Sequence, residues 1–406
     1  MNASKTLTLS IVILGSISSS FALTWADTGA PHNAWGSMAM SADGSRLAAT
    51  VSSKSPTPIY YSTNGGASWT SNAAPAQIWQ NIVASADGNT LLATVASYLK
   101  TNTVYFSTNA GATWTCRSNA PVIGQIACSA DGWKWIASAG FNGIYTSTDL
   151  GISWTSNNVP TGFWSAVASS ADGTRLVAVM ATSTAGGSYY LRIYASSDSG
   201  NSWSLTPAPS LTWTSIASSA DGTRLAAVAT HTAYTSGALY TSADSGSHWT
   251  LSSAVNNAWQ SIACSADGRK LIAAAPWDSS AVVAVPLYIS TNAGSSWITT
   301  NSPAEYWSFV ASSADGNMLA AISNLGGIWS AQATPRTPLN LAPANGTLVF
   351  SWPISSAHFV LQQRLDLAAA DWVTVTNPPV LNYSNLQYQV VITPNGSSAL
   401  YRLATP

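Results

Sequence analysis

The stretch WGSMAMSADG, residues 35–44, decides the fold, because its SADG tetrad returns six more times before residue 320. Successive tetrads are separated by 41 to 49 residues. A repeat of this length indicates an array built from one supersecondary unit, and it is a stronger signal than local propensity. The serine of the tetrad falls at Ser41, Ser85, Ser129, Ser170, Ser219, Ser265 and Ser313.

A second motif, S-x-(D/N)-x-G-x-x-W, follows six of the tetrads. Short runs rich in Val, Ile and Ala flank each Asp-Gly of SADG, which predicts a hairpin of strands A and B. A tyrosine two residues before the second motif marks strand C, and its tryptophan begins strand D. Four short antiparallel strands per unit, in seven units, predict an all-β fold, a seven-bladed β-propeller. The second motif begins at Ser62, Ser107, Ser147, Ser196, Ser242 and Ser290.

The second motif resembles the Asp-box of the bacterial neuraminidase repeat. Its copies are STNGGASW, STNAGATW, STDLGISW, SSDSGNSW, SADSGSHW and STNAGSSW, over about residues 25–329. The resemblance implies a C–D turn in which the Asp or Asn side chain accepts backbone N–H groups. Families that share the box include sialidases, xyloglucan-cleaving glycosidases, sorting receptors and a photosystem II assembly factor, so the box implies a fold and not a reaction.

The spacing of the repeats predicts how the ring closes. Trp25 precedes Ser41 by 16 residues, the usual distance from a box tryptophan to the next tetrad, while the seventh unit ends near Trp329 without a box. We therefore expect the N-terminal strand to complete the last blade and remove its exposed edge. The predicted order is a signal peptide (1–22), the propeller (23–334), a Pro-rich linker (335–345) and a small β-sandwich (346–406) that resembles fibronectin III-like modules.

The ends and the composition predict export. Lys5, an apolar run over 7–17 and small residues up to Ala22 are typical of a secretory signal peptide cleaved after Ala22. No later stretch is long and apolar enough to span a membrane. Charged residues are only 7% of the chain and the net charge is −1, which excludes a basic nucleic-acid surface. Three cysteines form no disulfide framework, and the histidines show no metal-ligand spacing, so we expect neither metal nor cofactor.

Variation between the units is concentrated on one face. SADG and box turns share a turn face, whereas the B–C segments differ in length and lie with the D–A loops on a loop face, the default place for recognition. We predict a ligand site there, near Trp277 and Tyr306.

A second rank of tryptophans stands six residues before the tetrad serines. They would either offer stacking faces for a ligand or pack between blades. They are Trp35, Trp79, Trp164, Trp213, Trp259 and Trp307, with Ile123 in the remaining unit.

Two functions from different classes fit this inventory. The leading expectation is an exported, monomeric, non-catalytic scaffold that binds a glycan or a protein at the loop face. The alternative is a glycosidase that uses Asp278 and Glu305, which lie on loops of adjacent units. A sialidase is excluded residue by residue, because Glu305 is the chain's only glutamate and no Phe/Tyr-Arg-Ile-Pro segment opens the propeller.

Overall fold

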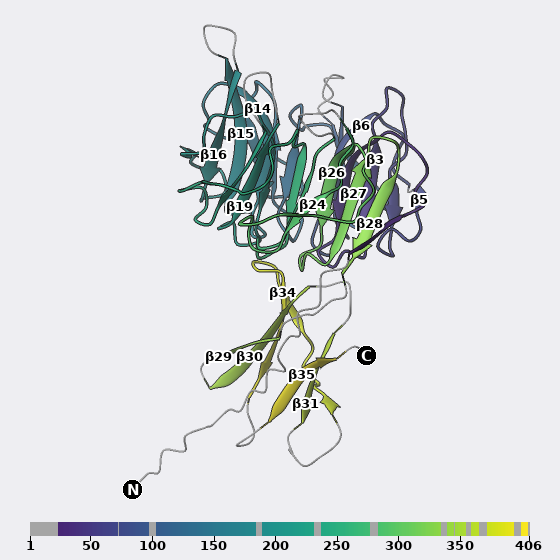
Figure 1. Ribbon diagram of the computed structural model, residues 1–406, viewed down its shortest axis with the longest axis vertical. Helices are drawn as coiled ribbons and strands as arrows, with labels where there is room; N and C mark the ends of the chain where they lie inside the picture. The colour runs from purple at the N-terminus through teal and green to yellow at the C-terminus, as the bar shows by residue number, and fades with distance from the viewer. Residues whose placement is uncertain are drawn as a thin grey trace.

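The computed structural model describes residues 23–404, except 72, 97–102, 184–188, 231–236, 277–282, 334–338, 345, 355–358, 365–371 and 394–398. Every helix or strand among these residues is a β-strand, as predicted. The strands form a larger group of sheets and a smaller body beside it (Figure 1).

The larger group consists, within the described residues, of seven four-stranded antiparallel sheets, numbered here in chain order. Sheet 1 holds β2 (Trp35–Met40), β3 (Leu47–Val51), β4 (Tyr60–Ser62) and β5 (Thr70–Ser71); sheet 2 holds β6 (Trp79–Ala84), β7 (Leu91–Val95), β8 (Val104–Ser107) and β9 (Thr115–Arg117). Sheet 3 holds β10 (Ile126–Cys128), β11 (Trp135–Ser138), β12 (Ile144–Ser147) and β13 (Thr155–Ser156); sheet 4 holds β14 (Phe163–Ser169), β15 (Leu176–Ser183), β16 (Tyr189–Ser196) and β17 (Ser204–Leu205).

Sheets 5 to 7 follow the same order. Sheet 5 holds β18 (Trp213–Ser218), β19 (Leu225–Ala229), β20 (Ala238–Ser242) and β21 (Thr250–Leu251); sheet 6 holds β22 (Ser261–Cys264), β23 (Leu271–Ala274), β24 (Tyr288–Ser290) and β25 (Ile298–Thr299). Sheet 7 holds β26 (Trp307–Ser312), β27 (Met318–Ser323), β28 (Ile328–Gln332) and, as its outer strand, β1 (Thr24–Asp27).

Burial falls from the second strand of each sheet to the fourth. All residues of β3, β7 and β19 are buried, because both faces of these strands are covered by neighbouring sheets. Their Val, Leu and Ala content suits such a site. The fourth strands β5, β13, β17, β21 and β25 are exposed.

Consecutive sheets pack face to face through separate apolar clusters. One such cluster joins sheet 7 to sheet 1, through Ala320, Ile322 and Ile328 on one side and Trp35, Leu47 and Val51 on the other. The tetrad alanines add a backbone link, since each donates its N–H to the carbonyl oxygen of the next alanine at 2.7–2.8 Å. This series runs from Ala42 through the seven repeats, and Ala314 donates back to Ala42.

Strand β1 pairs antiparallel with β28, with Trp25 opposite Ala331. This is the pairing that the spacing of the repeats predicts. The ring centroids of Trp25 and Trp307 lie 6.3 Å apart, and the box tryptophan Trp69 lies 6.3 Å from Trp35 in sheet 1. Trp25 therefore takes the place of a box tryptophan for sheet 7, although it lies at the other end of the chain.

The smaller body contains two sheets. One has the order β29 (Asn340–Ala344), β30 (Thr347–Pro353), β34 (Gln387–Ile392) and β33 (Val380–Asn382); the other has the order β32 (Val373–Thr374), β31 (Val360–Arg364) and β35 (Leu400–Ala404). They share one apolar cluster, in which the rings of Phe350 and Tyr401 lie 4.3 Å apart. Strand β29 occupies residues that the sequence assigned to the linker, because it pairs with β30 along its whole length.

Candidate functional site

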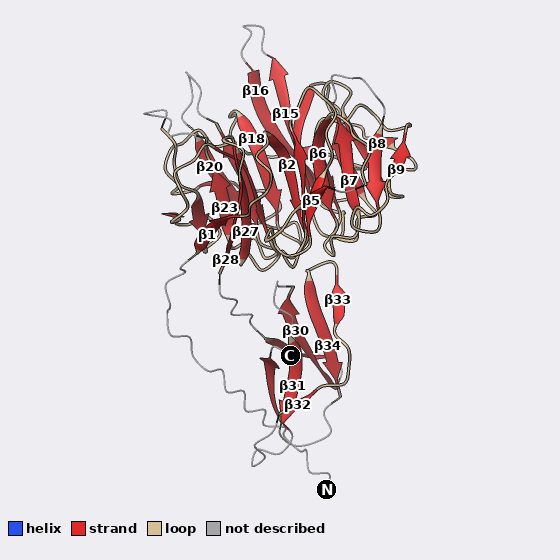
Figure 2. Cartoon of the chain, turned by 90° about the vertical axis from the view of Figure 1, so that its right-hand side faces the viewer, coloured by secondary structure: helices blue, strands red, loops and turns tan. Residues whose placement is uncertain are grey.

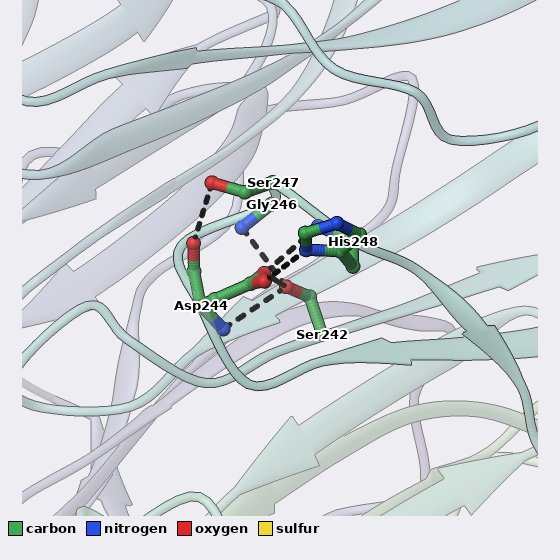
Figure 3. A network of polar contacts seen from close by, with 5 residues as sticks. All are labelled: Ser242, Asp244, Gly246, Ser247 and His248. Atoms are coloured by element: carbon green, nitrogen blue, oxygen red, sulfur yellow. Dashed lines mark hydrogen bonds and ion pairs between the residues drawn. The ribbon is translucent and has the colours of Figure 1, made fainter.

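The turn face carries hydrogen-bonded turns that are saturated by their own groups. In the box turn of sheet 5 (Figure 3), Ser242 Oγ donates to Asp244 Oδ1 at 2.9 Å and accepts the Gly246 N–H at 2.9 Å. Asp244 Oδ1 also accepts the N–H of His248 at 2.8 Å. The Asn boxes repeat this pattern, as Ser68 N–H donates to Asn64 Oδ1 at 2.9 Å. These polar groups have partners within the turn and are not available for chemistry.

The electrostatics of the turns agrees with this structural role. The hydrogen bond to the His248 ring and the His248 N–H lower the pKa of Asp244 to about 2. Burial raises the pKa of Asp172, but hydrogen bonds from Ser170 and Thr174 outweigh burial, and the net pKa lies below its usual value. A carboxyl that is held ionised by its own turn is a poor general acid.

Basic side chains after the tetrads link one repeat to the next. Lys134 Nζ donates to the carbonyl oxygen of Asp172 at 2.8 Å, and Lys270 Nζ does the same to Asp315. Their stems pack over the next tetrad glycine, so that a Cβ on Gly222 would lie 2.6 Å from Arg175 Cβ. These basic side chains therefore make contacts between sheets, whereas the ion pair of His248 with Asp244 lies within one box turn.

The centre of the turn face is covered by the smaller body (Figure 2). Ile354, Leu381, Leu386 and Tyr388 pack against the ring of tetrad alanines. The loop face lies on the opposite side, where the β15–β16 hairpin extends outward. Only the loop face leaves its centre uncovered by another part of the described chain.

The tryptophan rank does not offer stacking faces, which corrects its assignment as ligand-binding. All six members are buried, with exposed fractions from 0% to 5%. In sheet 2, Trp79 meets Tyr105 edge-on at 5.3 Å and Trp114 at 6.5 Å, and its Nε1 donates to Thr57 O. The tryptophan rank therefore packs between sheets, which is the second of the two roles that the sequence left open. The members are Trp35, Trp79, Trp164, Trp213, Trp259 and Trp307.

The other predicted loop-face residues are only partly placed. Trp277 and Asp278 lie outside the described residues. Tyr306 is half-buried, and its carbonyl oxygen accepts the Asn324 N–H at 2.9 Å. Glu305 is also half-buried, and its Oε2 accepts a hydrogen bond from Ser323 Oγ at 2.8 Å. This hydrogen bond joins Glu305, which precedes β26, to the last residue of β27. Among the described residues, no hydrogen bond joins Glu305 to a second carboxylate.

Phe141 and Phe163 form an exposed aromatic pair on the loop face, which the sequence did not bring together. Phe141, between β11 and β12, is 76% exposed, and Phe163, at the start of β14, is 41% exposed. Their ring centroids lie 5.1 Å apart at 67°, an edge-to-face arrangement. Gly140 has φ 58° and its Cβ position would lie 3.2 Å from the Phe163 ring. Glycine thus lets Phe163 lie against the backbone, and the pair joins sheets 3 and 4.

A signal for this pair exists in the sequence. The unit of sheet 3 has the shortest distance between its tetrad and its box, 18 residues from Ser129 to Ser147. In the structure this short connection leaves Phe141 mostly exposed. The shortest B–C connection is thus the feature of the sequence that accompanies the exposed pair.

No group of three or more His, Cys, Asp or Glu side chains that could hold a metal ion occurs among the described residues. In the same part of the chain, no helix is long and apolar enough to span a bilayer.

The chain matches no protein-family model and no curated protein. Solved structures are similar to it. YCF48 from Cyanidioschyzon merolae has a TM-score of 0.55 and 12% identity over 75% of this chain and 98% of that chain. A structure described as YCF48 bound to D1 peptide has 0.56 and 15% over 80% and 100%. The β-propeller domain of Swd1 from Myceliophteria thermophila has 0.55 and 13% over 74% and 97%. At these identities the likeness shows the fold alone, and that fold is a β-propeller.

Proposed function

We propose that this protein is an exported, non-catalytic scaffold that binds an extended segment of another protein on the loop face of its propeller. The observation that carries the proposal is the Phe141–Phe163 pair, which exposes two large apolar rings on a face that nothing else in the described chain covers. Exposed aromatic anchors contribute most of the binding energy in protein interfaces.

The architecture that we propose for this scaffold is a seven-bladed Asp-box propeller, closed by β1, with a C-terminal β-sandwich. Three separate contacts support closure between sheets 7 and 1. They are the alanine hydrogen bond from Ala314 to Ala42, the apolar cluster around Ile322 and Leu47, and Met318, which packs against Gly44. A rigid ring can hold loops of unequal length in fixed positions, which is what recognition needs.

A protein segment fits the aromatic pair better than a sugar does. Phenylalanine has no hydroxyl or N–H, so the pair offers apolar contact without the hydrogen bonds that sugar hydroxyls require. Its edge-to-face geometry leaves a corner between two rings, which suits a branched apolar side chain. The likeness to YCF48 bound to D1 peptide supports the same class of ligand, since that propeller holds a peptide.

Selection from a random 12-residue peptide display library on the mature protein tests the proposal. We expect enriched peptides with apolar side chains whose binding weakens about tenfold or more in Phe141→Ala, because truncating an aromatic anchor costs about 2 kcal/mol. Trp133→Ala is the matched control, since Trp133 is 54% exposed in the tetrad turn of the same sheet, on the turn face. Binding should be unchanged there.

Two results would overturn the proposal. Peptides that lose affinity in Trp133→Ala and not in Phe141→Ala would move the site to the turn face. Hydrolysis of a polysaccharide that disappears in Glu305→Gln would establish the glycosidase alternative in place of a scaffold.

A further inference from the structure

A cavity of about 190 Å³ lies where all seven sheets meet on the turn-face side. Its wall contains the residues that directly precede the tetrad serines, and also the tetrad serines and alanines. One lining residue comes from outside the seven sheets, namely Leu386 of the smaller body. The cavity is therefore bounded by the propeller on its sides and by the β33–β34 turn at its turn-face end.

The β33–β34 turn holds Leu386 in a backbone conformation that leucine rarely adopts. Leu386 has φ 54°, in the left-handed region that favours glycine or asparagine. Such a conformation is strained, and it persists only where its surroundings compensate. Asn385 stands immediately before it, so the chain places the leucine, and not the asparagine, at the strained position.

The surroundings of Leu386 compensate for this strain. Its side chain packs with Ile354 against the ring of tetrad alanines, and its carbonyl oxygen accepts the Ile354 N–H at 3.1 Å. Ile354 directly follows β30 and is only 3% exposed. The alanine side chains are small, so their ring leaves room for two branched side chains at its centre.

Tyr388 extends the contact from the cavity to sheet 1. It is half-buried among the same residues as Leu386. Burial raises the pKa of Tyr388, and the carboxylate of Asp43 in the first tetrad raises it further. The phenol ring thus lies near a tetrad turn, and the smaller body contacts the propeller at more than one point.

We propose that the β33–β34 turn is a stopper, which anchors the C-terminal body on the alanine ring and closes the turn-face end of the central cavity. Small solutes then reach the cavity only from the loop face. This inference concerns the opposite face from the proposed ligand site and does not depend on the protein having a peptide ligand. The partner of the alanine ring is a segment of the same chain.

Cysteine labelling tests the stopper in the full-length mature protein. Cys128 and Cys264 line the cavity, whereas Cys116 is exposed on β9 and serves as an internal control. Each protein is treated with N-ethylmaleimide at one fixed pH, and modification of the three cysteines is followed by mass spectrometry. We expect Cys116 to react quickly in every variant, and Cys128 and Cys264 to react slowly in the wild type.

Opening the stopper should accelerate the two cavity cysteines. In Leu386→Gly the backbone φ is retained without strain while the side chain is lost, and in Leu386→Asp a charge is placed on the alanine ring. We expect both changes to raise the Cys128 and Cys264 rates about tenfold or more, because the reagent then enters directly from the turn face and no longer only from the loop face. Val380→Ser is the matched control, since Val380 lies on β33 but is 66% exposed.

Unchanged rates in Leu386→Gly, with Cys116 and the circular dichroism spectrum also unchanged, would overturn the stopper. An equal increase of the Cys128 and Cys264 rates in Val380→Ser would also overturn the stopper. It would show that the cavity opens after any change in the smaller body. The glycine variant decides the matter even where Leu386→Asp fails to fold.

Discussion

The turn face and the loop face of this propeller use their side chains in opposite ways. On the turn face, each tetrad serine donates to its own aspartate at 2.5–2.6 Å. The box turns are saturated in the same internal manner. On the loop face, Phe141 and Leu325 are 76% and 63% exposed, and neighbouring connections have different lengths.

The polar residues of the motifs are therefore engaged within their own turns. The repeated turns satisfy their own backbone groups, and near-identical turns offer no unequal contacts on which specificity depends. The loop-face connections differ in length, and one of them leaves the Phe141 ring exposed. Substitutions and deletions on the two faces should therefore differ in their effects on stability.

Removal of residues 23–32 should have the largest effect. The deletion unpairs the outer edge of β28 and removes Trp25, which packs on Trp307. Loss of a buried tryptophan alone costs about 3–5 kcal/mol, so we expect the free energy of unfolding to fall by about 5 kcal/mol or more. Urea denaturation of chains that begin at residue 23 and at residue 33 measures it. An unchanged midpoint would show that β1 does not close the ring.

Truncation of an aromatic residue should distinguish the buried rank from the exposed pair. Trp259 is fully buried between sheets 5 and 6, so Trp259→Ala should cost about 3–5 kcal/mol. Phe141→Ala should change the free energy of unfolding by less than about 0.5 kcal/mol, because its ring is mostly exposed. Both are measured by urea denaturation. A large loss in Phe141→Ala would mean that this ring serves packing and not recognition.

Two glycines with similar backbone angles separate strain from contact between sheets. Gly222 has φ 69° and faces Arg175 of the preceding repeat, whereas Gly29 has φ 64° and nothing within 4 Å of its Cβ position. We expect Gly29→Ala to cost about 1 kcal/mol from the backbone alone. Gly222→Ala should cost about 2–3 kcal/mol, since the Arg175 stem must also move. Equal losses in the free energy of unfolding, measured by denaturation, would show that Arg175 does not pack tightly against Gly222.

Lowering the pH should reduce the stability that the Asp boxes contribute and leave that of the Asn boxes unchanged. This is the smallest of the expected effects. The folded pKa of Asp244 is about 2, below its usual 3.8, so its stabilisation is complete above about pH 4 and is lost as the pH falls toward 2. Asp244→Asn should therefore reduce the loss of stability between pH 5 and pH 2.5, measured by urea denaturation. Asn292→Asp should increase that loss, and an identical pH profile in both variants would contradict the assignment.

The local elements were largely predictable from the sequence. Each tetrad and each box stands in its expected turn, because Asp-Gly and Ser-x-Asx-x-Gly satisfy their own backbone groups within a few residues. The pairing of β1 with β28 was also predictable, since a fixed spacing of 16 residues between Trp25 and Ser41 places that strand within a repeat.

The candidate site was much less predictable. Trp35 and its five equivalents were regular enough to be noticed, but regular spacing does not distinguish a residue that faces a ligand from one that packs between sheets. Phe141 and Phe163 belong to different units and meet only because consecutive sheets stand side by side. Trp277 and Asp278 lie outside the described residues, so their predicted roles are still predictions.

The sequence by itself determined the repeating unit, its turns and the strand that completes the last sheet, because these follow from hydrogen bonds and spacings along the chain. Only the tertiary structure decided that the alanine ring is covered by Leu386 and Ile354, and that two phenylalanines face solvent together. Those contacts join segments whose distance depends on how the sheets are staggered and where the C-terminal body docks. Neither the stagger of the sheets nor the docking position of the C-terminal body can be inferred from a local pattern of residues.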